Sequence, residues 1–262
     1  MKADMISHFL SESGIRLTIC DATAAATEVQ TLHALSTDKA AFLGKLCVGA
    51  ALLATDFKNH EGISVKWETG SALGTFHVDA YDGRFVRGYA DDADDSASSR
   101  LFVTRYSLLR QPYTGAVDLE SDDISKGFAA YLKSSEQICA AVKIDWKDAK
   151  DGTCLRCAGF LAELLPQGDE KVFEQLFSDT SSYDMTTEGD EETLLEKGEF
   201  MQLAENPISF RCTCGEDRIR DALLLLPEKE KEELIRDGIV ESTCRYCGKT
   251  YRVSTDFLKQ SK

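Results

Sequence analysis

A chain of 262 residues, 43% of them hydrophobic, can form one large domain or a large and a small one, and wholesale disorder is excluded. The formal net charge of −15 argues against nucleic acid or an anionic membrane as the main partner, because both are bound by cationic surfaces. No segment has the roughly 18 apolar residues of a membrane span, and residues 1–10 lack the pattern of a secretory signal, so we expect a cytoplasmic protein. In that compartment, nine cysteines indicate metal binding or thiol chemistry rather than structural disulfides.

Residues 1–178 predict an α+β domain with an antiparallel sheet. A helix capped by Asp38 is expected to run to about residue 57, because apolar residues recur at helical spacing between residues 43 and 53. Alternating apolar residues then predict strands, some of them joined by turns such as Asp82–Gly83. The expected strands lie at about 63–67, 76–80, 86–90, 140–146 and 153–161, with a strand pair over 101–117 broken near Gln111 and Pro112, an acidic loop over 91–99 and a helix over 124–134.

The composition changes after residue 178. Residues 179–192 are rich in Ser, Thr, Asp and Glu, and charged, weakly helical sequence continues to Glu205. We therefore expect three parts: an N-terminal domain over residues 1–178, a metastable linker over 179–210 and a cysteine-rich C-terminal domain over 211–262.

Two close pairs of cysteines lie in the C-terminal domain. One residue separates Cys212 from Cys214, two separate Cys244 from Cys247, and 29 residues lie between the pairs. Zinc prefers four soft ligands in a tetrahedron, and closely spaced thiolates supply two ligands each with little distortion of the backbone. The spacing predicts one zinc ion on these four cysteines. Four unrelated buried cysteines, or a zinc ion with a purely structural role, are the alternatives that spacing alone leaves open.

The residues around the pairs suit such a site. Gly215 and Gly248 follow the two pairs, and we expect both to adopt a positive φ that turns backbone amides toward the sulfurs. The other expected elements are a helix with Ile219, Leu223 and Leu226 on one face, a second helix from Pro227 to the residue before Gly238, and a strand containing Tyr251 and Val253.

The cysteine spacing resembles that of the 33-kDa heat-shock protein family of redox-regulated holdase chaperones, in which the one-residue gap of the first pair is a signature. The resemblance extends along nearly the whole chain. Further matches are Arg87–Ala90, Ser135–Gln137, Ala158–Phe160, Leu164–Pro166, Phe210–Cys214 and Asp221–Leu223. The chain departs from the family in its linker, which has little of the usual helical, hydrophobic pattern, and in Cys154 and Cys157, which stand where small apolar residues are usual.

The resemblance implies a chaperone, not an enzyme, that binds unfolding client proteins. It implies an inactive state with reduced cysteines and bound zinc, an active oxidised state, and a homodimer on activation. If disulfides form within the pairs, Cys212 with Cys214 and Cys244 with Cys247, nothing links the two ends of the C-terminal domain, which should then unfold and uncover apolar surface for clients. The chain has no Gly-x-x-x-x-Gly-Lys-Ser/Thr motif, which favours activity without ATP.

The other cysteines are interpreted as structural. Cys154 and Cys157 have the spacing of a thioredoxin-like dithiol, but in a strand, residues three apart face opposite sides, so the pair should be unable to meet. Cys20, Cys47 and Cys139 have apolar neighbours and are predicted to lie in the core. Two rival classes remain: a zinc-stabilised interaction or regulatory protein without a redox switch, and a dithiol oxidoreductase that uses Cys154 and Cys157.

Overall fold

The computed structural model describes residues 3–58, 61–92, 98–107 and 110–260. The chain divides into two compact units, Met1–Arg211 and Cys212–Lys262. Across the described ranges, we find no helix with both the length and the hydrophobicity needed to cross a membrane.

The first unit contains two large sheets. One has the strand order β10-β1-β2-β9-β8, and all its neighbouring strands are antiparallel. The other has the order β11-β5-β4-β3-β6-β7, in which only the pair β11 and β5 is parallel. The strands are β1 (Met5–Leu10), β2 (Ile15–Asp21), β3 (Gly62–Glu68), β4 (Thr75–Tyr81), β5 (Phe85–Asp91), β6 (Ser99–Ser107), β7 (Arg110–Leu119), β8 (Ala140–Asp148), β9 (Cys154–Leu164), β10 (Met201–Pro207) and β11 (Ser209–Phe210).

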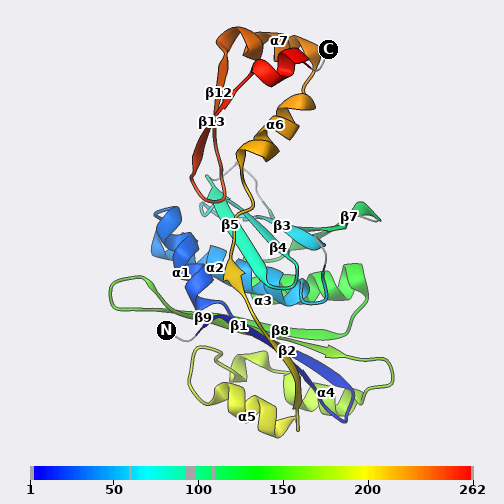
Figure 1. The fold of residues 1–262 in the computed structure, drawn as a ribbon. Helices are drawn as coiled ribbons and strands as arrows, with labels where there is room; N and C mark the ends of the chain where they lie inside the picture. Colours follow the sequence, from blue (N-terminus) through cyan, green and yellow to red (C-terminus); the bar gives the residue numbers. More distant parts are fainter. Residues whose placement is uncertain (1–2, 59–60, 93–97, 108–109, 261–262) are drawn as a thin grey trace. The chain divides into compact units, whose positions relative to one another are not determined.

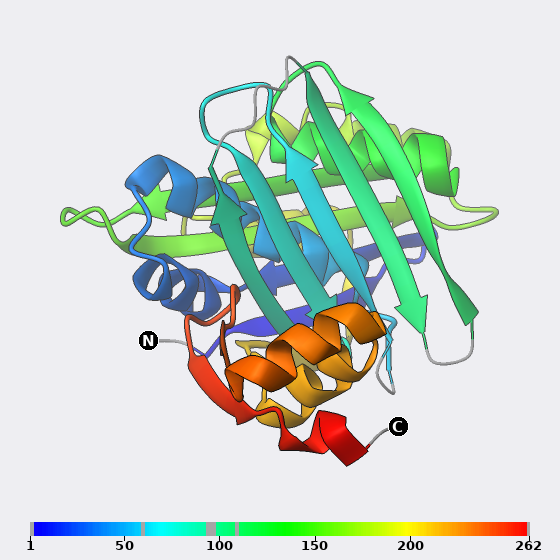
Figure 2. The same cartoon turned by 90° about the horizontal axis from the view of Figure 1, so that it is seen from above.

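Three helices fill the space between the two sheets: α1 (Thr23–Leu32), α2 (Thr37–Leu53) and α3 (Ile124–Tyr131), the last continued by a π-helical turn, η1 (Leu132–Glu136) (Figure 1). Figure 2 shows the second sheet lying across these helices. Most of α2 is apolar, and its side chains share one buried cluster with Val78 of the second sheet and Leu161 of the first. A helix that is apolar on all sides is typical of such a central position.

Two shorter helices, α4 (Glu170–Phe177) and α5 (Asp190–Lys197), cover the other face of the first sheet (Figure 1). A second buried cluster forms there, in which Phe160 of β9 packs against Phe177 and Tyr183, with ring centroids 5.6 and 5.8 Å apart. Met185 and Leu194 belong to the same cluster. Strand β9 is therefore buried on both faces, as is usual for a strand covered by helices on each side.

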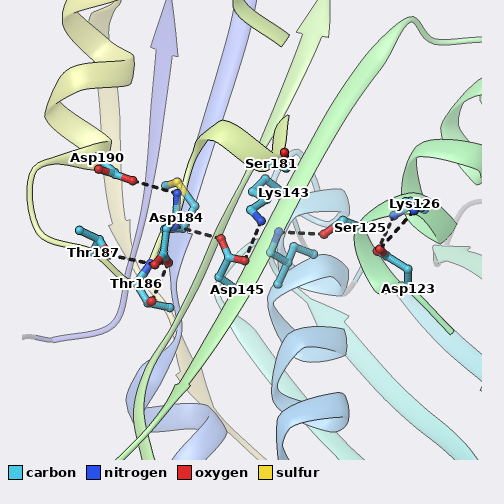
Figure 3. Close-up of polar contacts among 12 residues, drawn as sticks. Asp123, Ser125, Lys126, Lys143, Asp145, Ser181, Asp184, Thr186, Thr187 and Asp190 are labelled. Atoms are coloured by element: carbon cyan, nitrogen blue, oxygen red, sulfur yellow. Dashed lines mark hydrogen bonds and ion pairs between the residues drawn. The ribbon is translucent and has the colours of Figure 1, made fainter. Parts of the chain in front are cut away.

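Polar contacts fix the segment between α4 and α5, which includes the short helical turn η2 (Thr180–Ser182) (Figure 3). Asp145 of β8 accepts a hydrogen bond from the N–H of Met185 (3.0 Å) and forms an ion pair with Lys143 (2.9 Å). The hydroxyl and N–H of Thr186 donate to the Asp184 carboxylate and lower its pKa. The bond from Met185 attaches the segment to β8, and the bonds from Thr186 hold the segment's own turn.

The second unit is small. It contains α6 (Glu216–Leu224), α7 (Glu228–Asp237), the hairpin of β12 (Ile239–Thr243) and β13 (Thr250–Ser254), and the helical turn η3 (Asp256–Gln260). Within its described residues, Leu223, Val253 and Leu258 are the buried apolar side chains besides Cys247. A core of this size contributes little to the free energy of folding. A unit this small therefore needs a cross-link or a bound metal to be stable.

The predicted α+β class with antiparallel sheets is confirmed, and each predicted strand overlaps an observed one. Two helix predictions need correction. The helix expected to reach about residue 57 ends at Leu53, and its N-cap is Ser36, so Asp38 lies in the first turn rather than at the cap. Of the acidic loop expected over residues 91–99, residues 93–97 lie outside the described ranges.

Two strand predictions also need correction. The break expected near Gln111 and Pro112 is wrong, because both residues lie within β7, an edge strand in which proline is tolerated. The charged residues up to Glu205 were expected to be weakly helical, but residues 201–207 form the edge strand β10. Residues 179–210 belong to the compact first unit, and their role as a separate metastable linker remains a proposal.

Candidate metal centre

The second unit brings together two cysteine pairs, one at its start and one in its hairpin turn. Cys212 and Cys214 precede α6, while Cys244 and Cys247 lie in the turn of the β12–β13 hairpin. In that turn the N–H of Cys244 donates to the carbonyl of Lys249 (2.9 Å), and the N–H of Gly248 donates to the carbonyl of Cys244 (2.8 Å). The turn therefore holds its two thiols side by side.

The four Sγ atoms lie within 4.8 Å of one another. Two close separations join the two pairs: 3.6 Å from Cys212 Sγ to Cys244 Sγ and 3.3 Å from Cys214 Sγ to Cys247 Sγ. In a tetrahedral site with Zn–S bonds of about 2.3 Å, the sulfurs are about 3.8 Å apart. These cysteines therefore have the chemistry and nearly the spacing of a four-thiolate zinc site, and they could hold a metal ion.

Hydrogen bonds distribute the protons unevenly over these thiols. Burial raises the pKa of Cys247 to about 12, and burial also raises that of Cys212. Burial likewise acts to raise the pKa of Cys214, but hydrogen bonds from Tyr251 and from the other three cysteines outweigh it and lower the pKa to about 7. A metal must displace the protons that remain, so metal binding should strengthen as the pH rises.

Sequence patterns missed the role of Tyr251. Its hydroxyl lies 3.1 Å from the Cys214 sulfur, because strand β13 returns antiparallel to β12 and places this side chain beside the cysteine pairs. The alternation that predicted the strand is correct, but it says nothing about which side chain reaches the thiols. A hydroxyl that donates to a ligand sulfur is the kind of outer contact that tunes a metal site.

The two glycines behave differently. Gly248 has φ +69°, as expected, but Gly215 has φ −179°, which is extended backbone open to any residue. The expectation of a positive φ at Gly215 is therefore wrong. Gly215 is the N-cap of α6, so the chain leaves Cys214 by entering a helix rather than by turning back.

The reason for dismissing Cys154 and Cys157 is also wrong. Cys157 pairs with Trp146 and Arg156 with Lys147, but the next residue, Asp148, pairs with Cys154, so β9 has a bulge at Leu155. A bulge inserts one residue and reverses the alternation of side chains beyond it. Both thiols consequently face the layer of helices and belong to the same buried cluster.

The remaining cysteines belong to the first unit. Cys20 and Cys47 are buried, as predicted, and burial raises the pKa of each thiol. Cys139 was also expected in the core but is exposed, because it immediately precedes the edge strand β8.

The class of protein is thus defined by a two-sheet α+β unit followed in the chain by a small unit whose four thiols could hold a metal ion. The model of the Hsp33 protein family matches residues 4–254, and the chain belongs to this family, which is one of chaperones.

Relatives of similar length support the assignment. A 33 kDa chaperonin of Geobacillus sp. (strain WCH70) is 28% identical over 90% of this chain and 89% of the relative. A 33 kDa chaperonin of Levilactobacillus brevis is 29% identical over 98% and 97% of the two chains. These relatives are named as chaperonins and not as enzymes.

A solved structure agrees in fold. The 33 kDa chaperonin (heat shock protein 33 homolog) of Thermotoga maritima aligns with a TM-score of 0.81 over 98% of this chain and 97% of that one. The sequence identity is 24%, so the likeness is one of fold.

Proposed function

We propose that this protein is a redox-regulated, ATP-independent holdase, inactive when reduced and zinc-bound and active when its four thiols are oxidised to disulfides. The observation that carries the proposal is the convergence of Cys212, Cys214, Cys244 and Cys247 from both ends of one small unit. Membership of a chaperone family supports the holdase activity, and the four thiols could control that activity through their oxidation state.

The small unit depends on these ligands because its core is so limited. Zinc bound to four thiolates would cross-link the two ends of the unit and add on the order of 10 kcal/mol to its folding. Oxidation by hypochlorite or peroxide converts the thiolates to sulfenic acids and then to disulfides, which are no longer effective ligands. The unit would then lose its main source of stability.

The pairing of the disulfides decides whether this design works. Bonds within each pair, Cys212 with Cys214 and Cys244 with Cys247, would leave the ends of the unit unconnected. Sulfurs of different pairs also lie close together, 3.6 and 3.3 Å apart, and disulfides formed there would keep the two cysteine pairs linked. We propose that the disulfides form within each pair. Only that pairing leaves the two cysteine pairs unlinked, so that oxidation unfolds the small unit.

Tryptic mapping of the oxidised protein tests the pairing. Trypsin cleaves after Arg211, Arg218, Arg245 and Lys249, so Cys212 and Cys214 share one peptide while Cys244 and Cys247 fall in two. The proposed pairing predicts an internal disulfide in peptide 212–218 and a link between peptides 237–245 and 246–249. A link from peptide 212–218 to either of the others would overturn the mechanism.

The client surface is proposed to lie under α4 and α5. Phe160 and Ala162 of β9, with Leu17 and Ile19 of β2, face this cover, and their burial depends on Phe173, Phe177, Tyr183, Met185 and Leu194. Only Arg211 separates Cys212 from β11, which has just two residues. This short segment is held at β5 by the Ser209 N–H to the Arg84 carbonyl (2.9 Å) and the Arg211 N–H to the Val86 carbonyl (3.0 Å). We propose that unfolding after Cys212 spreads back through β11 and β10 to α5 and uncovers this apolar face.

Light scattering by an aggregating client, without added nucleotide, tests the activity. The oxidised protein should suppress scattering and the reduced, zinc-loaded protein should not, with zinc release following oxidation. Equal performance in both states would favour the rival reading, a zinc-stabilised interaction or regulatory protein without a switch. Light scattering coupled to gel filtration should also find a homodimer after oxidation, as the family resemblance implies.

A further inference from the structure

The register of β8 and β9 places Cys154 and Cys157 close to the upper end of the Cα separations that a disulfide bridges. Their strand partners, Asp148 and Trp146, are two residues apart, which corresponds to about 6.6 Å along a strand. Because the bulge at Leu155 absorbs the extra residue, the Cα atoms of the two cysteines should be about as far apart. Disulfides join Cα atoms roughly 4.4–6.8 Å apart, so a small movement of one cysteine suffices.

The segment that carries Cys154 is well placed to make that movement. Cys154 begins β9, directly after the exposed turn at Asp151 and Gly152. Its N–H donates to the Oε1 of Gln30 (3.1 Å), while the N–H of Cys157 donates to Thr23 (3.0 Å). Cys157 is therefore fixed in the middle of the sheet, and Cys154 lies at its end.

A cavity gives small molecules a route to one thiol of the two. It has a volume of about 650 Å³ and is lined by Cys154, by Thr23 and by residues from Thr187 to Glu192 at the start of α5. Cys157 is fully buried and is not among the described residues that line it. An oxidant in the cavity would meet Cys154 first.

Arg156 holds the wall of this cavity in place. Its guanidinium forms ion pairs with Asp21 (3.4 Å) and with Glu191 of α5 (3.7 Å). The second ion pair joins α5 to the strand that carries both cysteines. Displacement of α5 would therefore widen the route to Cys154.

We propose that Cys154 and Cys157 form a second redox site, a dithiol that a hydroperoxide reaches through the cavity beneath the start of α5 and oxidises to a disulfide. The Cys154 sulfur attacks the peroxide, the O–O bond breaks, and Cys154 sulfenic acid forms with release of water or an alcohol. The Cys157 sulfur then attacks the Cys154 sulfur, and the hydroxyl leaves as water with the thiol proton. Two thiols lose two electrons in total, and the peroxide gains them.

The two cysteines have different roles in this reaction. Cys154 is the residue that reacts with peroxide, and Cys157 resolves the sulfenic acid. Burial raises the pKa of Cys154 to about 12, so its thiol stays protonated at neutral pH and reacts slowly. The site is thus suited to sustained rather than brief exposure to peroxide.

Peptide mapping of the full-length, zinc-loaded protein after hydrogen peroxide treatment tests the proposal. Trypsin cleaves after Lys150, Arg156 and Lys171, so the disulfide links peptide 151–156 to peptide 157–171. We expect this linked pair to appear and to be lost on reduction. The zinc ligands are read from other peptides of the same digest, so failure of the proposed switch and failure of this site are seen separately.

A matched pair of variants tests the route. Glu191→Gln removes the ion pair with Arg156, and the linked peptides should form roughly two- to fivefold faster. Glu196→Gln removes the same charge from an exposed residue of α5 that is outside both that ion pair and the lining of the cavity, and the rate should not change. Equal rates for Glu191→Gln and wild type would overturn the route.

The exposed Cys139 is the internal reference. If Cys154 and Cys157 both remain free after prolonged treatment, long past full oxidation of Cys139, or if Cys154 is oxidised while Cys157 stays alkylatable, the proposal is wrong. A disulfide from Cys154 to any other cysteine would overturn it equally.

Discussion

Gly215 and Gly248 follow the two cysteine pairs at equivalent places but differ in backbone conformation. Gly248 is left-handed, with φ +69°, whereas Gly215 is extended, with φ −179°. A side chain added at either position would meet no atom within 4 Å. The two sites therefore differ in backbone strain and not in space, so substitutions at them form a matched pair.

Serine at these two positions should have opposite effects. Gly248→Ser should lower the free energy of unfolding of the zinc-loaded small unit by about 1–2 kcal/mol, because a left-handed conformation disfavours any residue with a Cβ. Gly215→Ser should be neutral or slightly stabilising, because serine is a good N-cap for α6. Denaturant titration of the zinc-loaded variants measures both. An equal decrease in the free energy of unfolding for both variants would contradict the proposed difference in backbone strain between the two glycines.

Tyr251→Phe removes the hydroxyl that lies 3.1 Å from the Cys214 sulfur. A hydrogen bond to a ligand sulfur stabilises the thiolate, and losing such an outer contact typically weakens metal binding by roughly tenfold or more. Competition with a chromogenic chelator should find weaker zinc binding in this variant. Tyr113→Phe, at an exposed tyrosine of β7, is the control and should bind as wild type does. Unchanged affinity in Tyr251→Phe would show that the hydroxyl is a bystander.

At the residue scale, a feature could be predicted when it depended on residues close together in the sequence, and could not when it depended on strand register. The convergence of the four cysteines could be predicted from their spacing, since two close pairs of thiols suit one tetrahedral ion. Tyr251 could not be found that way, because its nearness to Cys214 depends on the register between β12 and β13. The shared face of Cys154 and Cys157 depends on a bulge, which shifts the alternation without any mark in the local sequence.

The α4–α5 cover is the element on which the proposed client surface depends. Phe177 of α4 packs against Phe160 of β9 and against Phe173 and Tyr183 of the cover itself, with ring centroids 5.2–6.4 Å apart. Truncating a buried phenylalanine costs about 3–5 kcal/mol of packing free energy. The cover should therefore detach more readily once this side chain is lost.

Phe177→Ala should give the reduced, zinc-loaded protein part of the activity otherwise seen after oxidation. Binding of a hydrophobic dye and suppression of client aggregation measure the exposed face. Phe102→Ala is the control, because Phe102 is a half-buried residue of β6 that contacts Lys66 and Arg100 rather than the cover. A Phe177→Ala variant that keeps its circular dichroism spectrum but neither binds dye nor holds clients would contradict the proposed surface.

At the element scale, helices and hairpins with local patterns were predictable, and long-range partners were not. The apolar run of α2 and the alternation in β3 and β4 mark buried elements directly. Strand β10 has no such pattern, because all seven of its residues are exposed and only pairing with β1, about 200 residues earlier, makes it a strand. Residues 179–192 were predicted to be a polar linker for a similar reason. Few of their side chains, such as those of Tyr183 and Met185, pack into the buried cluster against the sheet.

For the whole molecule, the two units differ in what holds them together. The first has two extended buried clusters, one between the sheets and one beneath α4 and α5. The second has a few buried apolar side chains and four converging thiols, while Leu225 and Ile239 remain largely exposed. Loss of the metal should therefore act on one unit and spare most of the other.

Chelation of zinc under reducing conditions should unfold residues 212–262 while the two-sheet core keeps its structure, because the core draws its stability from burial and the small unit from its ligands. Hydrogen exchange followed by mass spectrometry measures this directly: peptides from α6, α7 and the β12–β13 hairpin should lose protection, and those from α2 and β9 should retain it. Adding zinc back should restore protection, which separates ligand loss from irreversible damage. Peptides from β10 and α5 should lie between these extremes if unfolding spreads back from Cys212. A small unit that stays protected without zinc would mean that oxidation cannot switch the protein by unfolding it.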